Sequence, residues 1–219
     1  MSLPIDASLG TALLSMVERQ HAPLVGAEDI TGRLATGSRR TFRLTFADGT
    51  VLKGRRFNSA MRALVTWRVL QSVAGLGLPR ALAHEGDAIL EEWVQGTSIR
   101  APYDADVYAA AGHLLGTLHR TPVPPTTDLR FQPLDAAGWA DKTRANLAEL
   151  RTRGLLTAPE AASLLAWGLD VTPDRVVMGI VHRDLCPENL LRDRAHRVIS
   201  VDNGTMSIGA LDHDLCRTW

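Results

Sequence analysis

The segment "VHRDLCPENLL", residues 181–191, restricts what this chain can fold into more than any other stretch. It places Asp184 and Asn189 in a short polar loop between apolar runs. A second apolar run, "VISVDNG" (198–204), follows across "RDRAH" and leads to Asp202. Two short apolar runs around a polar turn predict a hairpin. We therefore expect these segments to hold a polar loop in one fixed place.

The spacing of these polar residues indicates metal-assisted phosphate chemistry. Asn189 lies five positions after Asp184, and Asp202 lies thirteen positions after Asn189. Carboxylate and amide oxygens are hard ligands that suit Mg²⁺, which binds through a few side chains and substrate phosphates. The order H-R-D-x-x-x-x-N, a strand and then D-x-G matches the catalytic and metal-binding segments of the protein-kinase-like fold.

The first part of the chain predicts a small antiparallel sheet. Residues 28–56 have the pattern of sheet, with strict alternation in "TFRLTF" (41–46) and a turn at "ADG" before the next strand. Residues 57–74 follow with apolar side chains at helical spacing. The segment "AHEGDAILEEWVQG" (83–96) then predicts two more strands about a Gly-Asp turn.

The second part of the chain is mostly helical. Residues 103–120 form a strongly amphipathic pattern that the proline-rich stretch 121–128 ends, and two more helices are expected near 135–153 and 158–170. The pattern predicts a nucleotide-binding lobe over residues 1–95. It also predicts a helical lobe with the catalytic loop and metal-binding segment over residues 96–219.

Composition excludes several broad classes. Lys plus Arg and Asp plus Glu both total 24, so no net field favours a nucleic-acid partner. The sequence contains no apolar run of 18 residues, so no membrane span is predicted. The first 20 residues lack a basic n-region and are expected to form a short helix rather than a signal peptide. Cys186 and Cys216 have no metal-ligand spacing, which favours a reducing, cytoplasmic setting.

The segments "VHRDLCPENLL" and "VDNGTMSIGALDHDL" resemble the aminoglycoside phosphotransferase (choline kinase-like) family of small-molecule kinases, from about residue 25 to the end. The resemblance implies a two-lobe, protein-kinase-like α+β fold. Its N-lobe is a small antiparallel sheet with one helix, and its helical C-lobe here lacks the family's usual C-terminal helices. It also implies ATP, or GTP, together with Mg²⁺.

By this resemblance, Asp184 is the catalytic base or orients the acceptor hydroxyl. Asn189 and Asp202 hold Mg²⁺. His182 ties the catalytic loop to the metal segment, and Asp214 bonds the backbone of that loop.

The N-lobe carries the residues that the resemblance assigns to nucleotide binding. Lys53 in "TVLKG" stands where a cation contacts the α- and β-phosphates, and alternation puts Val51 on the same face, where it could pack on adenine. Gly37 and Ser38 at a loop tip would let backbone N–H groups approach phosphates, although they equally suit an ordinary hairpin. Arg39 and Arg40 are expected to be solvated, and phosphate contact is the alternative for them.

The segment "ILEEWVQG" resembles the hinge between the lobes. The resemblance assigns the Glu92 carbonyl and the Val94 N–H to the adenine edge, and a plain edge strand is the alternative. Besides the missing C-terminal helices, two departures from the family pattern stand out. Residues 57–74 contain no acid to pair with Lys53, and Ala63 occupies the expected position. Ala210 replaces the first Asp of the later motif.

The function that follows is transfer of the γ-phosphate to a hydroxyl of a small molecule: an aminoglycoside or other antibiotic, a sugar or an amino alcohol. The alternative is a catalytically weak pseudokinase, acting as a nucleotide-binding or scaffold module. A protein Ser/Thr kinase is a minor alternative. Only eleven residues separate Asp202 from Asp214, and Cys186 replaces the lysine that such kinases carry after the catalytic Asp.

Overall fold

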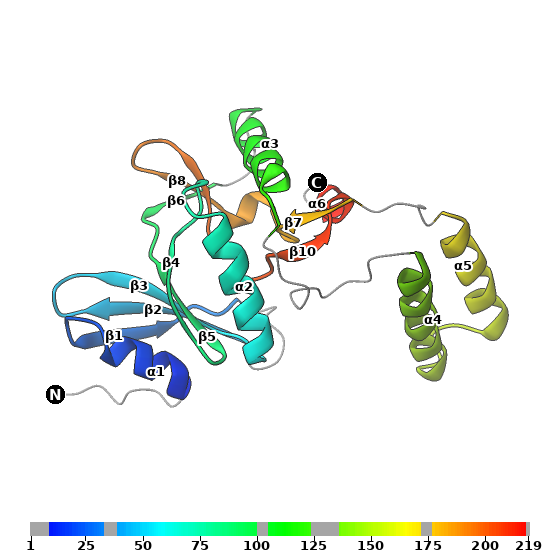
Figure 1. The fold of residues 1–219 in the computed structure, drawn as a ribbon, viewed down its shortest axis with the longest axis horizontal. Helices are drawn as coiled ribbons and strands as arrows, with labels where there is room; N and C mark the ends of the chain where they lie inside the picture. The colour runs from blue at the N-terminus through cyan, green and yellow to red at the C-terminus, as the bar shows by residue number, and fades with distance from the viewer. Residues whose placement is uncertain (1–8, 33–38, 100–104, 124–135, 172–176, 218–219) are drawn as a thin grey trace.

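The computed structural model describes residues 9–32, 39–99, 105–123, 136–171 and 177–217. A five-stranded sheet with two helices forms the N-terminal part, and short strands and helices form the rest (Figure 1). This is the mixed α+β architecture that the sequence predicts.

The N-terminal sheet is antiparallel throughout, in the order β1-β2-β3-β5-β4. Its strands are β1 (Leu24–Asp29), β2 (Arg40–Phe46), β3 (Val51–Arg56), β4 (Ala81–Glu85) and β5 (Ala88–Glu92). Both predicted hairpins are confirmed: β2–β3 turns at Gly49, whose φ of 84° suits glycine, and β4–β5 turns at Gly86–Asp87. The sheet begins earlier than expected because Leu24 already pairs with Phe46.

Alternation along the strands gives the sheet two different faces. Phe42, Leu44 and Leu90 are buried on one face, against α1 (Gly10–Glu18). The opposite face carries Ile89 and packs on α2 (Ala60–Ser72), the helix that the sequence predicts over 57–74. Residues that alternate with Leu52 and Leu90 therefore point toward the α2 side.

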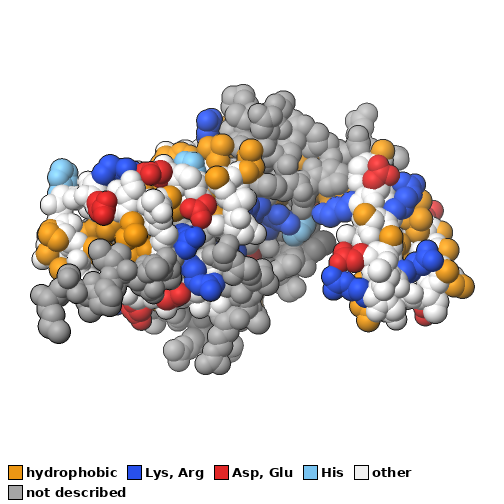
Figure 2. Space-filling model, turned by 90° about the horizontal axis from the view of Figure 1, so that it is seen from below, with side chains coloured by type: hydrophobic (Ala, Val, Ile, Leu, Met, Phe, Trp, Pro, Cys, Tyr) orange, Lys and Arg blue, Asp and Glu red, His pale blue; other side chains and the backbone are white. Residues whose placement is uncertain are grey.

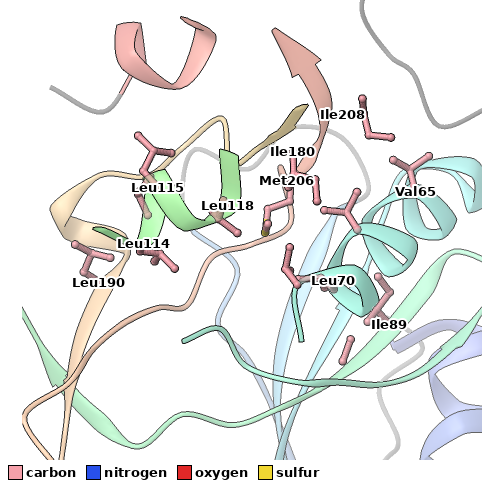
Figure 3. Close-up of a cluster of buried hydrophobic side chains, with 14 of the residues drawn as sticks. Val65, Leu70, Ile89, Leu114, Leu115, Leu118, Ile180, Leu190, Met206 and Ile208 are labelled. Atoms are coloured by element: carbon pink, nitrogen blue, oxygen red, sulfur yellow. The ribbon is translucent and has the colours of Figure 1, made fainter. Parts of the chain in front are cut away.

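The larger apolar cluster joins the two parts of the chain. It unites side chains of α2 and β5 with those of α3 (Ala105–Arg120), β7 (Met178–Val181) and β10 (Ser207–Ala210). Figure 3 shows Val65, Ile89, Leu118 and Ile180 among its members. The cluster contains residues from both sides of the expected boundary between residues 95 and 96. The division of the chain into two lobes at that boundary therefore stays a prediction.

Two small sheets flank residues 182–189, the loop that the sequence predicts to be catalytic. β6 (Gly96–Ser98), β8 (Leu190–Asp193) and β9 (Val198–Ser200) pair in that order, which confirms the predicted hairpin across "RDRAH". β7 pairs with β10, a contact between segments more than 20 residues apart that local patterning does not reveal. A 3₁₀ turn, Pro187–Asn189, and helix α6 (Asp212–Arg217) complete this region.

The helices α4 (Ala136–Thr152) and α5 (Ala158–Asp170) confirm the last two predicted helices and pack against each other (Figure 1). The start of α5 is fixed by a capping box, in which the Thr157 side chain accepts from Glu160 N–H and the Glu160 carboxylate accepts in return. Acidic and basic side chains are interspersed on this pair (Figure 2). Within the described ranges, no helix is long and apolar enough to cross a membrane.

The shared core predicts that shortening one buried side chain lowers the free energy of unfolding strongly. Leu118 on α3 is fully buried in the cluster that joins both parts of the chain. Leu118→Ala should lower the free energy of unfolding by about 2–5 kcal/mol, because it removes apolar contacts and leaves a cavity. Leu155→Ala, at a site that is 66% exposed, should change it by less than about 0.5 kcal/mol. Chemical denaturation of both variants checks this, and equal losses would contradict the assigned core.

Candidate active site

The loop between β7 and β8 holds Asp184 in place through Asn189. The Asn189 Nδ2 donates to the Asp184 backbone oxygen at 2.9 Å and to its Oδ2 at 3.1 Å. The 3₁₀ turn makes this possible, because Asn189 N–H bonds back to the Cys186 carbonyl at 2.9 Å. Since the amide nitrogen is used on Asp184, the Asn189 oxygen is the atom suited to a hard metal ion.

The segment around Asp202, which the sequence predicts to bind metal, lies beside this loop. Val201 N–H donates to the Asn189 carbonyl at 3.0 Å, so Asp202 follows directly after a residue bonded to Asn189. No group of three or more His, Cys, Asp and Glu side chains capable of holding a metal occurs in the described part of the chain. One amide oxygen and one carboxylate nevertheless fit Mg²⁺, which takes its remaining ligands from water and phosphate.

Asp214 on α6 binds the backbone at the start of the loop that carries Asp184. Its fully buried carboxylate accepts the N–H of His182 at 2.8 Å and that of Arg183 at 2.6 Å. It also lies 3.1 Å from His119 Nε2 on α3. Arg183 donates its N–H from a left-handed backbone conformation (φ 68°), which non-glycine residues rarely adopt.

His182 joins the loop to the metal segment. Its Nε2 lies 2.8 Å from Ser200 Oγ and 2.9 Å from Asn203 Oδ1, next to Asp202. Burial lowers the pKa of His182 and outweighs the neighbouring carboxylates, which favours the neutral ring. A neutral ring suits a structural hydrogen bond better than proton transfer.

Asp202 is surrounded by cations. Its Oδ1 lies 3.1 Å from Arg55 Nη1 and 3.2 Å from Arg39 Nη2. Burial alone would raise the pKa of Asp202, but Arg55, Lys53 and Arg39 outweigh burial and lower that pKa to about 2. The expectation that Arg39 is solvated is wrong, because this side chain is partly buried against Asp202.

Lys53 lies on β3 with its side chain only 11% exposed. Its amine donates to the Val201 carbonyl and lies 4.0 Å from a carboxylate oxygen of Glu91 on β5. Burial, followed by the nearby Arg55, lowers the pKa of Lys53 to about 8. As the sequence indicates, α2 supplies no acid, and Ala63 is fully buried at the expected position.

A cavity of about 220 Å³ opens between the two parts of the chain. It brings together Lys53, Glu92, Val94 and Asp202, which sequence reasoning assigned to nucleotide or metal binding. Its described lining is Ile30, Gly32, Thr41, Lys53, Pro79, Glu92, Trp93, Val94, Leu191, Val201 and Asp202. The apolar walls are supplied by Ile30, Leu191 and Val201, and Val51 is not among these lining residues. Gly37 and Ser38 lie outside the described residues.

Two buried charged residues of the site went unnoticed in the sequence. Arg55 and Glu91 are both fully buried, with Arg55 Nε 3.3 Å from Glu91 Oε1. A signal was present, since Arg55 alternates onto the same face as Lys53. Glu91 was hidden because its partner on β3 depends on the register between two strands that are distant in sequence.

Comparison with known proteins agrees with this geometry. The model of the phosphotransferase enzyme family matches residues 29–219. No curated protein matches the chain significantly. Among solved structures, a macrolide 2′-phosphotransferase from Brachybacterium faecium is 18% identical, with a TM-score of 0.63, covering 93% of this chain and 74% of its own.

Two further structures are similar. An aminoglycoside-3′-phosphotransferase of type VIII is 20% identical, with a TM-score of 0.62, over 97% of this chain and 83% of its own. The ternary complex of the aminoglycoside phosphotransferase APH(2″)-IIa with streptomycin and ATP is 14% identical, with a TM-score of 0.66, over 97% and 75%. These likenesses confirm the predicted kinase-like fold. Because the family model spans nearly the whole described chain, the protein belongs to the phosphotransferase enzyme family.

Proposed function

We propose that this protein is an ATP- and Mg²⁺-dependent phosphotransferase that transfers the γ-phosphate to a hydroxyl group of a small molecule. The observation that carries the proposal is one cavity lined by Lys53, Val94 and Asp202, next to a loop in which Asn189 clamps Asp184. Cation, metal ligands and acidic residue are the parts that phosphoryl transfer requires.

Nucleotide binding would use both parts of the chain. The adenine would lie between the apolar side chains of Ile30 and Leu191, with the Glu92 carbonyl and Val94 N–H at its edge. Lys53 would contact the α- and β-phosphates, and Gly37 and Ser38 stay predicted to cover them. ATP is favoured over GTP because the similar ternary complex contains ATP.

Asn189 Oδ1 and Asp202 would hold the metal. A metal held there would supply positive charge that offsets the negative charge of the transferred phosphoryl group. The low pKa of Asp202 keeps this ligand ionised throughout the neutral range. Arg39 and Arg55, which pair with Asp202, would also lie close enough to the phosphates to reduce their mutual repulsion.

Asp184 would act on the acceptor. Held by Asn189, its carboxylate would orient the acceptor hydroxyl in line with the γ-phosphate and accept the hydroxyl proton as the new P–O bond forms. Transfer would be direct, without a phosphoenzyme. His182 and Asp214 would act only by holding this loop in position.

The acceptor is a small molecule rather than a protein in this proposal. Between Asp202 and Asp214 the chain is occupied by a turn, strand β10 and the start of α6, which leaves no long peptide-binding segment there. The similar structures are named for macrolide, aminoglycoside and streptomycin ligands. We therefore propose a hydroxylated antibiotic as the first candidate acceptor, with a role in antibiotic resistance, and a sugar or amino alcohol as the second.

The free thiol of Cys186 suits the reducing cytoplasm that we propose as the setting.

A pseudokinase is the second candidate, because two guanidinium groups already pair with the Asp202 carboxylate. In that case Mg·ATP would raise the thermal midpoint without turnover on any hydroxyl acceptor. Asp184 and Asn189 retain the arrangement expected of an active enzyme, which favours the first candidate.

Replacing the proposed base separates chemistry from binding. Asp184→Asn should lower kcat by about 10²–10⁴-fold, because a neutral amide cannot accept the hydroxyl proton. The Kd for Mg·ATP should stay within about twofold, as measured by calorimetry, since Asp184 is not among the described lining residues of the cavity. Glu188→Gln on the same loop, at an exposed side chain, is the matched control and should keep full activity. Full activity of Asp184→Asn would exclude Asp184 as the base.

The pKa of Lys53 predicts a pH dependence of nucleotide binding. With this pKa at about 8, the amine is charged below that pH and neutral above it in the nucleotide-free protein. The Kd for Mg·ATP should be flat below about pH 8 and should rise by about tenfold per pH unit above it, because binding then requires uptake of a proton. Calorimetry between pH 6.5 and 9.5 checks this. Lys53→Met should bind more weakly and without this dependence, and an equal slope in both proteins would contradict the assignment.

A further inference from the structure

A fully buried ion pair lies on β3 and β5, two neighbouring strands of the N-terminal sheet. Arg55 on β3 and Glu91 on β5 both have 0% side-chain exposure, and their charged groups approach to 3.3 Å. Neither carboxylate oxygen of Glu91 has a hydrogen-bond partner among the described residues, and the same is true of Arg55 Nε and Nη2. Burying such a pair stabilises a fold little, since desolvation offsets the attraction. Stability alone therefore gives a weak reason for it.

The register places Glu91 against Lys53. Lys53 and Glu91 are direct partners in the β3–β5 ladder, and Arg55 lies two residues further along the same face. The second Glu91 oxygen lies 4.0 Å from Lys53 Nζ. One buried carboxylate thus lies between two cations, on the side of the sheet where α2 offers no acid.

The other end of Arg55 reaches the metal segment. Its Nη1 lies 3.1 Å from Asp202 Oδ1, although the Asp202 side chain is 43% exposed. Arg55 also explains Gly204, because a Cβ at residue 204 would lie 1.7 Å from Arg55 Nη1. The "DNG" segment therefore packs closely on this guanidinium group, and Gly204 leaves the space that the group occupies.

We propose that Arg55 and Glu91 are positioning residues that replace the missing α2 carboxylate. Glu91 holds the Lys53 amine toward the nucleotide phosphates, and Arg55 holds Asp202 toward the metal. This inference rests on the proposed function. It means that the rigid strands β3 and β5, rather than the position of α2, keep the cation and the metal ligand aligned.

Kinetics of two variants test the proposal. Glu91→Gln should lower kcat by about 10–100-fold, since small misplacements of reacting groups have effects of this size, while the acceptor KM stays within about twofold. The double variant Arg55→Met/Glu91→Leu should unfold at a thermal midpoint close to that of the wild type, because apolar replacement of both partners of a buried ion pair is tolerated. Its kcat should nevertheless remain low. Recovery of wild-type kcat in the double variant would show that the pair is only structural and would overturn the proposal.

Glu85→Gln is the control for loss of a carboxylate on this sheet, because Glu85 pairs with Arg19 at the surface. It should keep wild-type kcat. If Glu91→Gln is as active as Glu85→Gln, the inference fails while the proposed function stands. Wild-type protein that neither binds Mg·ATP nor transfers phosphate would overturn the proposed function and this inference together.

A labelling measurement on the nucleotide-free protein gives a second readout. The chain has two lysines, Lys53 and the exposed Lys142, so an amine-acylating reagent can be followed at Lys53 with Lys142 as internal reference. Loss of the Glu91 carboxylate should raise the Lys53-to-Lys142 labelling ratio several-fold, because the amine is no longer held or kept charged. An unchanged ratio in Glu91→Gln would show that Glu91 does not hold Lys53.

Discussion

The buried carboxylate of Asp214 is the interaction on which the catalytic region depends. It accepts hydrogen bonds from two successive backbone N–H groups at the start of the catalytic loop and contacts His119 on α3. Through His182, the same loop is bonded to Ser200 and Asn203 beside Asp202. Three segments distant in sequence are thereby fixed to one another. These hydrogen bonds connect the loop that carries Asp184 to the segment that carries Asp202.

Opposite charges face one another in the cleft next to this loop. Lys53, Arg39 and Arg55 face two carboxylates, Asp202 and Glu91, in a region that is largely removed from water. In our proposal, nucleotide phosphates and Mg²⁺ enter this arrangement together, one bringing negative charge and the other positive. The partly exposed carboxylate is Asp202, and the fully buried one is Glu91. This difference in exposure suits Asp202 as a metal ligand at the surface of the cleft and Glu91 as a positioning residue behind it.

The sequence predicts those parts whose cause is local. Alternation in residues 41–46, the Gly-Asp turn at 86–87 and the amphipathic pattern of 103–120 lead to the observed strands and helix. The catalytic loop is also predictable, because Asp184 and Asn189 lie in one short segment with a characteristic spacing. The resemblance to phosphotransferases rests on these residues, and the family match confirms it.

The remaining features depend on contacts between distant segments. Pairing of β7 with β10 joins residues near 180 and 208, and nothing in either short strand identifies its partner. Glu91 appears in sequence as one of two adjacent acids at the hinge, and only the β3–β5 register distinguishes it from Glu92. Arg39 likewise looks solvated until the fold brings it to Asp202. The roles assigned to the site residues, and the boundary at 95–96, stay predictions.

The most direct test of the central claim is transfer of phosphate by the wild-type protein. The protein would be incubated with Mg²⁺, γ-labelled ATP and a panel of macrolides, aminoglycosides, sugars and amino alcohols, and the products would be identified by mass spectrometry. Our account predicts a labelled phosphoryl group on a hydroxyl of at least one acceptor, and none when Mg²⁺ is chelated. Tight binding of Mg·ATP without transfer to any acceptor in the panel would contradict it and favour the pseudokinase.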